Sequence, residues 1–270
     1  MNERAAPAAS AAEAVDAGAA NVRLRALGDA AWTVELGDAI DAPTHARVMG
    51  LAQALTRARA AGDLPGVIEW VPAFRSLTVY FDALATDAEA LAARLRQLGA
   101  SATRLPSAGR RWRLPVYFGA AAGPDLEALA AHAGLSVEGV IARLTGTVFE
   151  VYMLGFMPGF PYMGGLPAEL AMPRLATPRK LVPQRSLAVA GRLCAIYPWD
   201  SPGGWRLLGR TPLPLFDAGD GDSPSLLAPG DQVMWQAIDA SRYAQLEAET
   251  RGARLQRSDF LIGADGAWPV

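Results

Sequence analysis

Basic side chains are concentrated between residues 174 and 210, a segment in which Asp200 is the single acidic residue. The basic residues of this segment are Arg174, Arg179, Lys180, Arg185, Arg192, Arg206 and Arg210. Arginine guanidinium groups bind carboxylate or phosphate through paired hydrogen bonds. Because successive residues of a strand point to opposite faces, some of these side chains must point to solvent, and we expect two or three of them to be functional.

Two glycine-rich loops are candidate binding elements. Residues 155–167 contain four glycines and three prolines, which bend the backbone tightly and keep it partly rigid. Such a loop can direct amide N–H groups at an anion or a carbonyl oxygen, or it can be an apolar loop that plugs one end of a barrel. Residues 200–205, Asp-Ser-Pro-Gly-Gly-Trp, either cradle a ligand or form a tight turn beside a buried tryptophan.

The composition excludes several other kinds of chemistry. The chain has two histidines, His45 and His132, and one cysteine, Cys194, so it has neither an internal disulfide framework nor a multi-cysteine zinc site. Its sequence contains no phosphate loop, dinucleotide-binding glycine motif, zinc-protease motif or nucleophile-elbow motif. We interpret His132 as structural and Cys194 as a buried thiol, and we expect no metal site and no redox cofactor.

The overall balance of charge and hydropathy predicts a cytoplasmic protein. The 270 residues include 25 basic and 27 acidic side chains, and a net charge of −2 argues against a general nucleic-acid or anionic-membrane binder. No apolar run approaches the roughly 20 residues that a membrane helix needs. Residues 1–21 are alanine-rich but interrupted by acidic residues, so we expect a disordered tail rather than a secretory signal.

Hydrophobic periodicity predicts an N-terminal α+β domain over residues 22–105. Alternating apolar residues indicate strands, and apolar residues at helical spacing indicate two helices on one face of their sheet. The expected strands are 22–26, 31–36, 67–71 and 76–81, and the expected helices are 43–61 and 87–98. A linker is expected over residues 99–111.

A second domain, residues 111–240, reads as a β-barrel because short strands alternate with proline and glycine. The expected strands are 112–117, 147–154, 186–197, 204–209 and 232–238. Two short helices are expected over 125–132 and 137–144, the second capped by Ser136. Residues 241–270 are expected to form a C-terminal extension.

The motifs of the second domain resemble, in order and spacing, those of the allophanate hydrolase subunit 1 family. The resemblance covers roughly residues 22 to 238 and is carried first by residues 155–167, Gly-Phe-Met-Pro-Gly-Phe-Pro-Tyr-Met-Gly-Gly-Leu-Pro. The other matching blocks are 123–126, His132, 134–136, 173–175, 178–179, 182–183, 201–205, 209–212 and 215–217.

The resemblance implies an α+β fold in which an N-terminal α+β domain precedes a cyclophilin-like β-barrel. It also implies a component like the 5-oxoprolinase B subunit, acting in an ATP-dependent amide or lactam hydrolase or a carboxyltransferase. The substrate would be a small amide or ureide, and ATP with Mg would be required. The implied partners are a subunit 2 protein, which is like the 5-oxoprolinase C subunit and supplies a homologous barrel, and a third 5-oxoprolinase subunit.

The site expected from the resemblance must stabilise phosphoryl transfer to an amide oxygen, which needs positioned cations and N–H donors more than a nucleophile. We therefore expect Arg174, Arg179 and Arg210 as catalytic residues that clamp carboxylate or phosphate. The expected substrate- or nucleotide-binding residues are Gly159, Phe160, Tyr162, Gly164, Gly165, Ser201, Gly203, Gly204, Trp205 and Thr211.

At three positions this chain lacks the polar residue that is usual in the family. Relatives usually carry histidine, glutamine and threonine where this chain has Leu144, Leu193 and Cys194. Loss of polar groups from a polar site reduces rate or specificity. The departures favour an alternative hypothesis, a non-catalytic regulatory module that resembles the histidine kinase inhibitor branch of the family. A peptidyl-prolyl isomerase is a third hypothesis, based on fold analogy alone.

Overall fold

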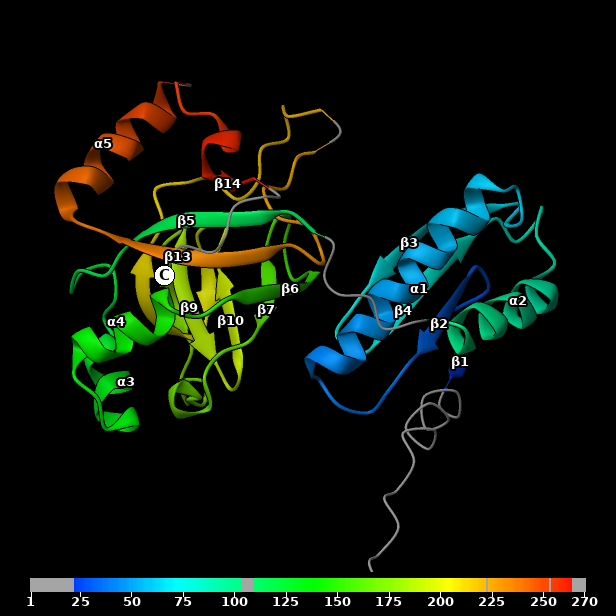
Figure 1. The fold of residues 1–270 in the computed structure, drawn as a ribbon, viewed down its shortest axis with the longest axis horizontal. Helices are drawn as coiled ribbons and strands as arrows, with labels where there is room; N and C mark the ends of the chain where they lie inside the picture. The colour runs from blue at the N-terminus through cyan, green and yellow to red at the C-terminus, as the bar shows by residue number, and fades with distance from the viewer. Residues whose placement is uncertain (1–21, 103–108, 222, 253, 264–270) are drawn as a thin grey trace, which may run out of the picture. The chain divides into compact units, whose positions relative to one another are not determined.

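The computed structural model describes residues 22–102, 109–221, 223–252 and 254–263. The chain divides into two compact units, residues 1–104 and 105–270, which are described separately below. Both units contain helices and strands, and the second contains a closed barrel (Figure 1). The predicted α+β class is therefore confirmed. Within the described ranges, no helix combines the length and apolar character needed to cross a membrane.

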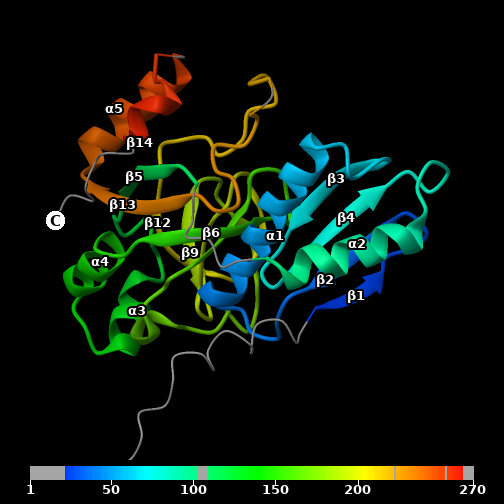
Figure 2. The same ribbon diagram turned by 45° about the vertical axis from the view of Figure 1, so that its right-hand side comes forward.

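The first unit is a four-stranded antiparallel sheet covered on one face by two helices (Figure 2). Its elements are β1 (Arg23–Ala26), β2 (Ala31–Glu35), α1 (Ala42–Ala60), β3 (Val67–Pro72), β4 (Ser76–Phe81) and α2 (Ala88–Ala100). The strand order is β1-β2-β4-β3. Leu77, Val79 and Phe81 alternate along β4 and are buried in one core with apolar residues of both helices. The predicted alternation is confirmed here.

The barrel of the second unit is closed by seven strands, to which an eighth short strand is added. The strands are β5 (Arg111–Tyr117), β6 (Phe149–Leu154), β7 (Pro161–Gly164), β9 (Ser186–Ala190), β10 (Leu193–Ile196), β12 (Arg206–Arg210), β13 (Gln232–Ile238) and β14 (Leu261–Ile262). Their order is β12-β9-β10-β7-β6-β13-β5-β14. A pairing of Arg210 in β12 with Tyr117 in β5 closes the barrel.

Helices and a strand pair surround the barrel. These elements are α3 (Leu126–Ala133), α4 (Val137–Thr145), α5 (Ala240–Arg251), the 3-10 helices η2 (Ala168–Leu170) and η3 (Arg257–Phe260), and the pair β8 (Arg179–Val182) with β11 (Ser201–Gly203). The Ser136 hydroxyl caps α4 by accepting from the Gly139 N–H at 3.1 Å, as predicted. α5 packs against β5, and β14 pairs with the same strand, so α5 and β14 belong to the second unit.

Strand β9 separates two apolar clusters, because both of its faces are covered. Leu187 and Val189 point into the barrel core, which also contains Trp112, Phe149 and Trp235. The intervening alanines, Ala188 and Ala190, pack instead in an outer cluster around Phe160 and Trp205. A strand that is buried on both faces has no polar alternation, which is why its sequence is almost continuously apolar.

Three sequence predictions for this unit are wrong in detail. The strand expected over 186–197 is a hairpin, because Gly191 has a φ of +55° and reverses the chain between β9 and β10. The loop 155–167 contains strand β7, which fills the gap between β6 and β10. The turn 200–205 contains β11, which pairs with β8. β7 and β11 were not predicted as strands because they are short and contain proline and glycine.

Candidate functional site

A pocket on the second unit brings together two of the three arginines expected to be catalytic. Its volume is about 330 Å³. The lining residues are Tyr117, Ala121, Ala122, Pro124, Arg179, Leu181, Pro183, Ser186, Leu207, Arg210 and Tyr243. They come from β5 and the loop after it, from β8, β9 and β12, and from α5. We call this cavity the Arg210 pocket. It lies where β12 meets β5 to close the barrel.

Arg179 lines the pocket but is already neutralised. Its Nη2 donates to Oδ1 of the buried Asp125 at 2.8 Å, and its Nη1 donates to the Trp205 carbonyl at 3.3 Å. The second oxygen of Asp125 accepts from the Leu207 N–H at 2.7 Å. Because Asp125 precedes α3, this network ties the start of that helix to β12 and β8. Arg179 therefore organises one wall of the pocket.

Arg210 also lines the pocket, and it donates a hydrogen bond to a backbone carbonyl. Its Nε donates to the Gln184 carbonyl at 2.9 Å. Among the residues that the structure describes, no carboxylate forms an ion pair with Arg210. The guanidinium is only partly exposed, so bulk water screens its charge incompletely. A half-buried cation with free N–H groups is suited to bind an anion.

Arg174 lies elsewhere, above an aromatic cluster. Its guanidinium carbon is 5.7 Å from the centre of the Trp205 ring, within the range of a cation–π contact. Burial raises the pKa of Tyr162, and the charge of Arg174 lowers it in part. Arg174 is not among the lining residues of the Arg210 pocket. The structure therefore does not join all three arginines in one cavity.

Phe160 is the centre of the aromatic cluster. Its ring centre lies 4.9 Å from that of Tyr162, 5.1 Å from that of Tyr197 and 6.0 Å from that of Trp205. Burial also raises the pKa of Tyr197, partly offset by a backbone hydrogen bond from Trp205 and the charge of Arg174. These contacts make Phe160 and Trp205 parts of a packed outer core. Tyr162 is half-buried at its margin.

The motif glycines are packed against the protein's own atoms. A Cβ at Gly164 would collide with the Tyr152 ring, and one at Gly203 would collide with the Tyr197 ring. Gly159, with a φ of +77°, would bring a Cβ within 2.8 Å of the Cβ of Phe216. These close approaches give the glycines a packing role. A role in binding ligand through their amides stays a prediction.

The remaining predicted binding residues have mixed surroundings. Gly165 has a φ of +97°, and a Cβ at Gly204 would meet no atom closer than 3.6 Å. Thr211 is buried, and its hydroxyl accepts from the Leu213 N–H at 3.3 Å. The Ser201 hydroxyl is buried without a hydrogen-bond partner among the described atoms. None of these residues is among those that line the Arg210 pocket.

Two of the departures from the family pattern lie in the barrel core. Leu144 and Cys194 are fully buried there. Burial raises the pKa of the Cys194 thiol, so the thiol stays protonated. Leu193 is partly buried against the aromatic cluster. None of the three lines the Arg210 pocket, so these changes leave its chemistry intact.

Sequence reasoning missed Tyr117 and Tyr243, which together form an aromatic wall of the pocket. Their ring centres are 5.8 Å apart. Tyr243 belongs to α5, within the segment expected to be an extension. The spacing of Tyr243 and Glu247 places both on one helix face, and Glu247 pairs with Arg185 at 2.8 Å. That spacing was the available signal, but it is too common to identify a site.

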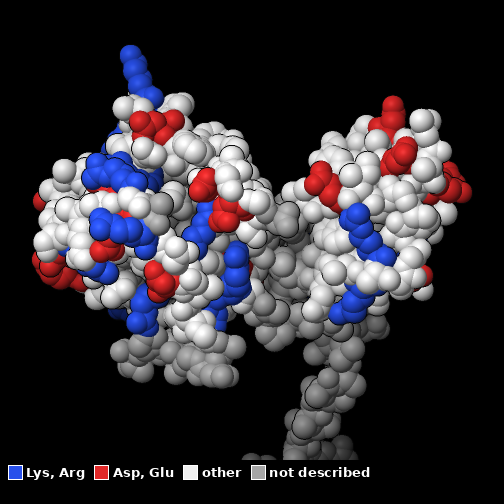
Figure 3. Space-filling view, turned by 90° about the horizontal axis from the view of Figure 1, so that it is seen from above, with Lys and Arg blue, Asp and Glu red and all other residues white. Residues whose placement is uncertain are grey.

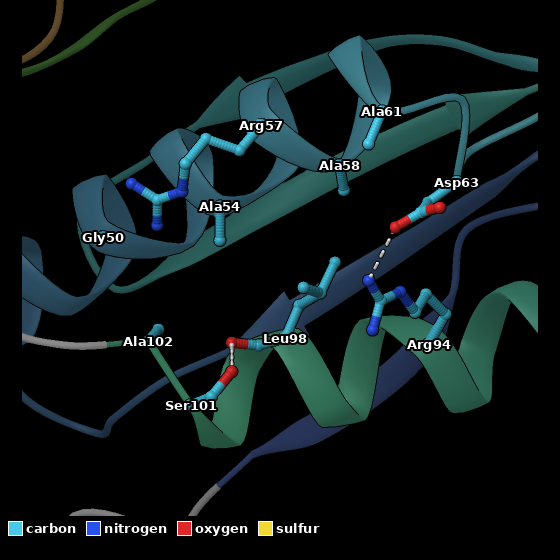
Figure 4. A pocket seen from close by; sticks show the side chains of 10 residues that line it. All are labelled: Gly50, Ala54, Arg57, Ala58, Ala61, Asp63, Arg94, Leu98, Ser101 and Ala102. Atoms are coloured by element: carbon cyan, nitrogen blue, oxygen red, sulfur yellow. Dashed lines mark hydrogen bonds and ion pairs between the residues drawn. The ribbon is translucent and has the colours of Figure 1, made fainter.

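A second cavity, of about 320 Å³, lies in the first unit between α1 and α2 (Figure 4). Alanines form much of its lining. Its charged side chains are engaged with neighbours: Arg94 pairs with Asp63 at 3.1 Å, and Arg57 donates to Gln53 at 2.9 Å. A cavity whose charges are satisfied locally has little to offer an ionic ligand, and we assign it no part in the site.

Carboxylates from elsewhere in the chain neutralise part of the basic segment. On the face of the second unit seen in Figure 3, Lys and Arg side chains are interspersed with Asp and Glu. Within the segment, Arg179 pairs with Asp125 and Arg185 pairs with Glu247. The excess positive charge predicted from the segment is therefore reduced locally. Of the two arginines that line the Arg210 pocket, Arg179 has a carboxylate partner and Arg210 has none among the described residues.

Comparison with known proteins identifies the family. Residues 22–227 match the carboxyltransferase domain, subdomains C and D. The chain belongs to this carboxyltransferase domain family. It is 40% identical over 210 residues to the 5-oxoprolinase B subunit of Escherichia coli O157:H7, covering 77% of this chain and 92% of that protein. It is 35% identical to the 5-oxoprolinase B subunit of Bacillus subtilis strain 168, covering 84% and 98%. The resemblance seen in the motifs is confirmed.

Solved structures share the carboxyltransferase-family fold. The crystal structure of TTHA0988 matches with a TM-score of 0.66 and 32% identity, covering 81% of this chain and 41% of that one. This chain thus spans about two fifths of TTHA0988. The Kluyveromyces lactis urea amidolyase matches with a TM-score of 0.69 at 20% identity, covering 87% of this chain and 16% of that one. The second likeness concerns the fold alone.

Proposed function

We propose that this chain is a component like the 5-oxoprolinase B subunit, acting in an ATP-dependent amide or lactam hydrolase. The observation that carries the proposal is its similarity to 5-oxoprolinase B subunits over nearly their whole length. The designation of those relatives as subunits supports an assembly with other proteins. We propose a subunit 2 protein as the main partner and a third 5-oxoprolinase subunit, in the cytoplasm, where ATP is supplied.

The proposed reaction opens a lactam in three steps. The lactam oxygen attacks the γ-phosphorus of ATP with Mg, the bond to ADP breaks, and the activated carbon becomes a good electrophile. Water then adds to this carbon, and the C–N bond breaks with proton transfer to nitrogen, which leaves an acyl phosphate. A second water hydrolyses the acyl phosphate, giving the carboxylate and releasing inorganic phosphate. For 5-oxoproline the products are glutamate, ADP and phosphate. Each step needs fixed cations and N–H donors near developing charge.

The Arg210 pocket suits the small substrate better than the nucleotide. Its volume of about 330 Å³ is near the lower end of the range for sites that hold drug-sized ligands. Arg210 provides a free guanidinium in that space, while Arg179 is held by Asp125. We therefore propose that this chain holds and orients the substrate, and that ATP with Mg reaches it from the partner. A carboxyltransferase reaction would place its acceptor in the same pocket.

Exposed aromatic residues favour a second candidate function, a regulatory module like the histidine kinase inhibitor branch. Phe156 is 63% exposed and has a φ of +68°, a strained conformation in a three-residue turn closed by Met157 and Gly155 at 2.8 Å. Trp199 is 45% exposed. Such a surface suits protein docking. Failure of a tenfold molar excess of the chain to inhibit a purified sporulation-type histidine kinase would exclude this candidate.

The main proposal is tested with the assembled complex. The chain is co-expressed with its subunit 2 and third-subunit partners, and ATP hydrolysis is measured with 5-oxoproline, other lactams and ureides. We expect a stable complex whose ATP hydrolysis is stimulated by at least one of these compounds. A stable complex that shows no stimulated turnover with any of them would overturn the proposal.

A further inference from the structure

We infer that the Arg210 pocket binds the carboxylate of a small monoanionic ligand, and that helix α5 completes the site through Tyr243. The inference deepens the proposed function, on which its choice of lactam probes rests. All the residues that line the pocket lie in the described part of the chain. Helix α5 thereby gains a role in ligand binding, although its sequence alone predicted only an extension.

One guanidinium in the pocket has no carboxylate partner among the described residues, so the pocket favours a ligand with one negative charge. The two nearby carboxylates are already engaged, since Asp125 pairs with Arg179 and Glu247 pairs with Arg185, each at 2.8 Å. Arg210 has no such partner among the residues described. One uncompensated guanidinium in a partly desolvated cavity favours a monoanion, because a more highly charged group would remain partly unpaired.

The Arg210 guanidinium is held in a fixed orientation. Its Nε donates to the Gln184 carbonyl at 2.9 Å, and the Gln184 N–H in turn donates to Asp200 at 2.6 Å. The next residue, Arg185, has a φ of +67°, and its carbonyl accepts from the Thr211 N–H at 3.0 Å. Hydrogen bonds therefore fix the backbone at Gln184 and Arg185, beside the guanidinium, and at Thr211, which follows Arg210. This leaves the two Nη groups for a carboxylate, which a guanidinium binds through two parallel hydrogen bonds.

The walls of the pocket select a compact, largely apolar body. Tyr117 and Tyr243 pack against each other, with ring centres 5.8 Å apart and an interplanar angle of 43°, and together form an aromatic wall. Leu181, Pro183 and Leu207 supply further apolar surface. A cavity of about 330 Å³ with one cation and apolar walls fits a five- or six-membered ring bearing a carboxylate.

Tyr243 adds a hydroxyl group that forms no hydrogen bond with the described part of the protein. Its hydroxyl is buried and has no hydrogen-bond partner among the described atoms. Burial raises the pKa of Tyr243, partly offset by the charges of Arg210 and Arg185, so the hydroxyl is a neutral donor at neutral pH. A buried hydroxyl without a partner costs free energy that a ligand carbonyl can recover. An amide oxygen on the ligand ring is the expected acceptor.

The test measures binding to the full-length chain alone, without partner or ATP, by NMR titration. The probes are 5-oxoproline, cyclopentanecarboxylate, which lacks the amide, and 2-pyrrolidinone, which lacks the carboxylate. We expect both carboxylates to bind and 2-pyrrolidinone to bind at least tenfold more weakly. Equal binding of 5-oxoproline and 2-pyrrolidinone, or no binding of either carboxylate, would overturn the inference.

Single substitutions test which residue of the pocket contacts each group of the ligand. Arg210→Gln should weaken both carboxylates about tenfold or more, as expected for a lost charge-assisted bond. Tyr243→Phe should weaken 5-oxoproline and leave cyclopentanecarboxylate nearly unchanged, a split that general damage to the pocket would not produce. Arg192→Gln is the matched control, because Arg192 is an exposed arginine at the far end of the β9–β10 hairpin. An unchanged affinity in Arg210→Gln would contradict the inference.

The outcomes separate this inference from the proposed function. Carboxylate binding that depends on Arg210, in a chain whose complex shows no ATP-dependent turnover, would reject the proposed function alone. An active complex whose carboxylate affinity is insensitive to Arg210→Gln would reject the pocket alone. Thermal unfolding of each variant checks that a lost signal does not reflect a lost fold.

Discussion

The arginines of the basic segment differ in function because they differ in partners. The sequence predicts that two or three basic residues of this segment are functional, and Arg179 and Arg210 line one pocket. The chain's pattern does not reveal that Asp125, more than 50 residues upstream, neutralises Arg179. It also does not reveal that Arg174 lies over Trp205 instead. Local spacing predicts strand faces, whereas ion pairing depends on tertiary contacts.

The ion pair between Arg179 and Asp125 should be structurally important. Asp125→Asn leaves Arg179 without its carboxylate partner, and we expect a loss of about 2 kcal/mol in the free energy of unfolding. Arg179→Gln alone should cost a similar amount. The double variant should lose clearly less than the sum, because each single change leaves the other partner uncompensated. Urea unfolding of the four proteins measures this coupling, and additive losses would show that the pair contributes little.

Glu35 should make the first unit sensitive to acid. A hydrogen bond from Arg25 lowers the pKa of Glu35, burial opposes this, and the charges of Arg25, Arg23 and Arg75 lower it further. A carboxyl whose pKa is lower in the folded state stabilises that state above its unfolded pKa. This stabilisation is lost as the pH falls through the folded pKa.

We therefore expect Glu35→Gln to be less stable than the wild type at pH 7, with a difference that shrinks as the pH is lowered from about 5 towards 3. Urea unfolding at each pH measures it. Glu69→Gln, which changes an exposed glutamate on β3, is the control and should show no such trend. A constant difference between Glu35→Gln and wild type across this pH range would contradict the assignment.

Among the secondary-structure elements, strands with clean alternation and capped helices were predictable, and short paired strands were not. β4 and α4 were predicted within a residue or two because alternation and the Ser136 cap are local signals. β7 and β11 are only four and three residues long and contain proline and glycine. Their strand character comes from the neighbours with which they pair, β6 and β10 for one and β8 for the other.

The motif glycines should affect stability, because they allow neighbouring elements to approach closely. Gly164→Ala in β7 would drive a Cβ into the Tyr152 ring, and we expect a loss of about 1–3 kcal/mol in unfolding free energy. Gly204→Ala is the matched control within the same motif set, because its Cβ would meet no atom closer than 3.6 Å. Thermal and urea unfolding compare the two. Equal stability of both variants would contradict the packing role of Gly164.

Across the full chain, the order of an α+β unit and a barrel unit followed from the sequence, while the completion of the pocket did not. The walls of the pocket come from β5, β8, β9, β12 and α5, which span residues 111–251. No local pattern connects Tyr117 with Tyr243. These segments come together because β5 pairs with β12 and closes the barrel.

The proposed role of the chain, as a working component of an ATP-dependent lactam hydrolase, is decided by following the product of the reaction. The measurement is formation of glutamate from 5-oxoproline by the assembled complex, with ATP and with each protein omitted in turn. We expect glutamate only when this chain, its partners and ATP are all present, with one ADP formed per glutamate. Glutamate formation at an unchanged rate without this chain, or none from the complete complex, would contradict the proposed role.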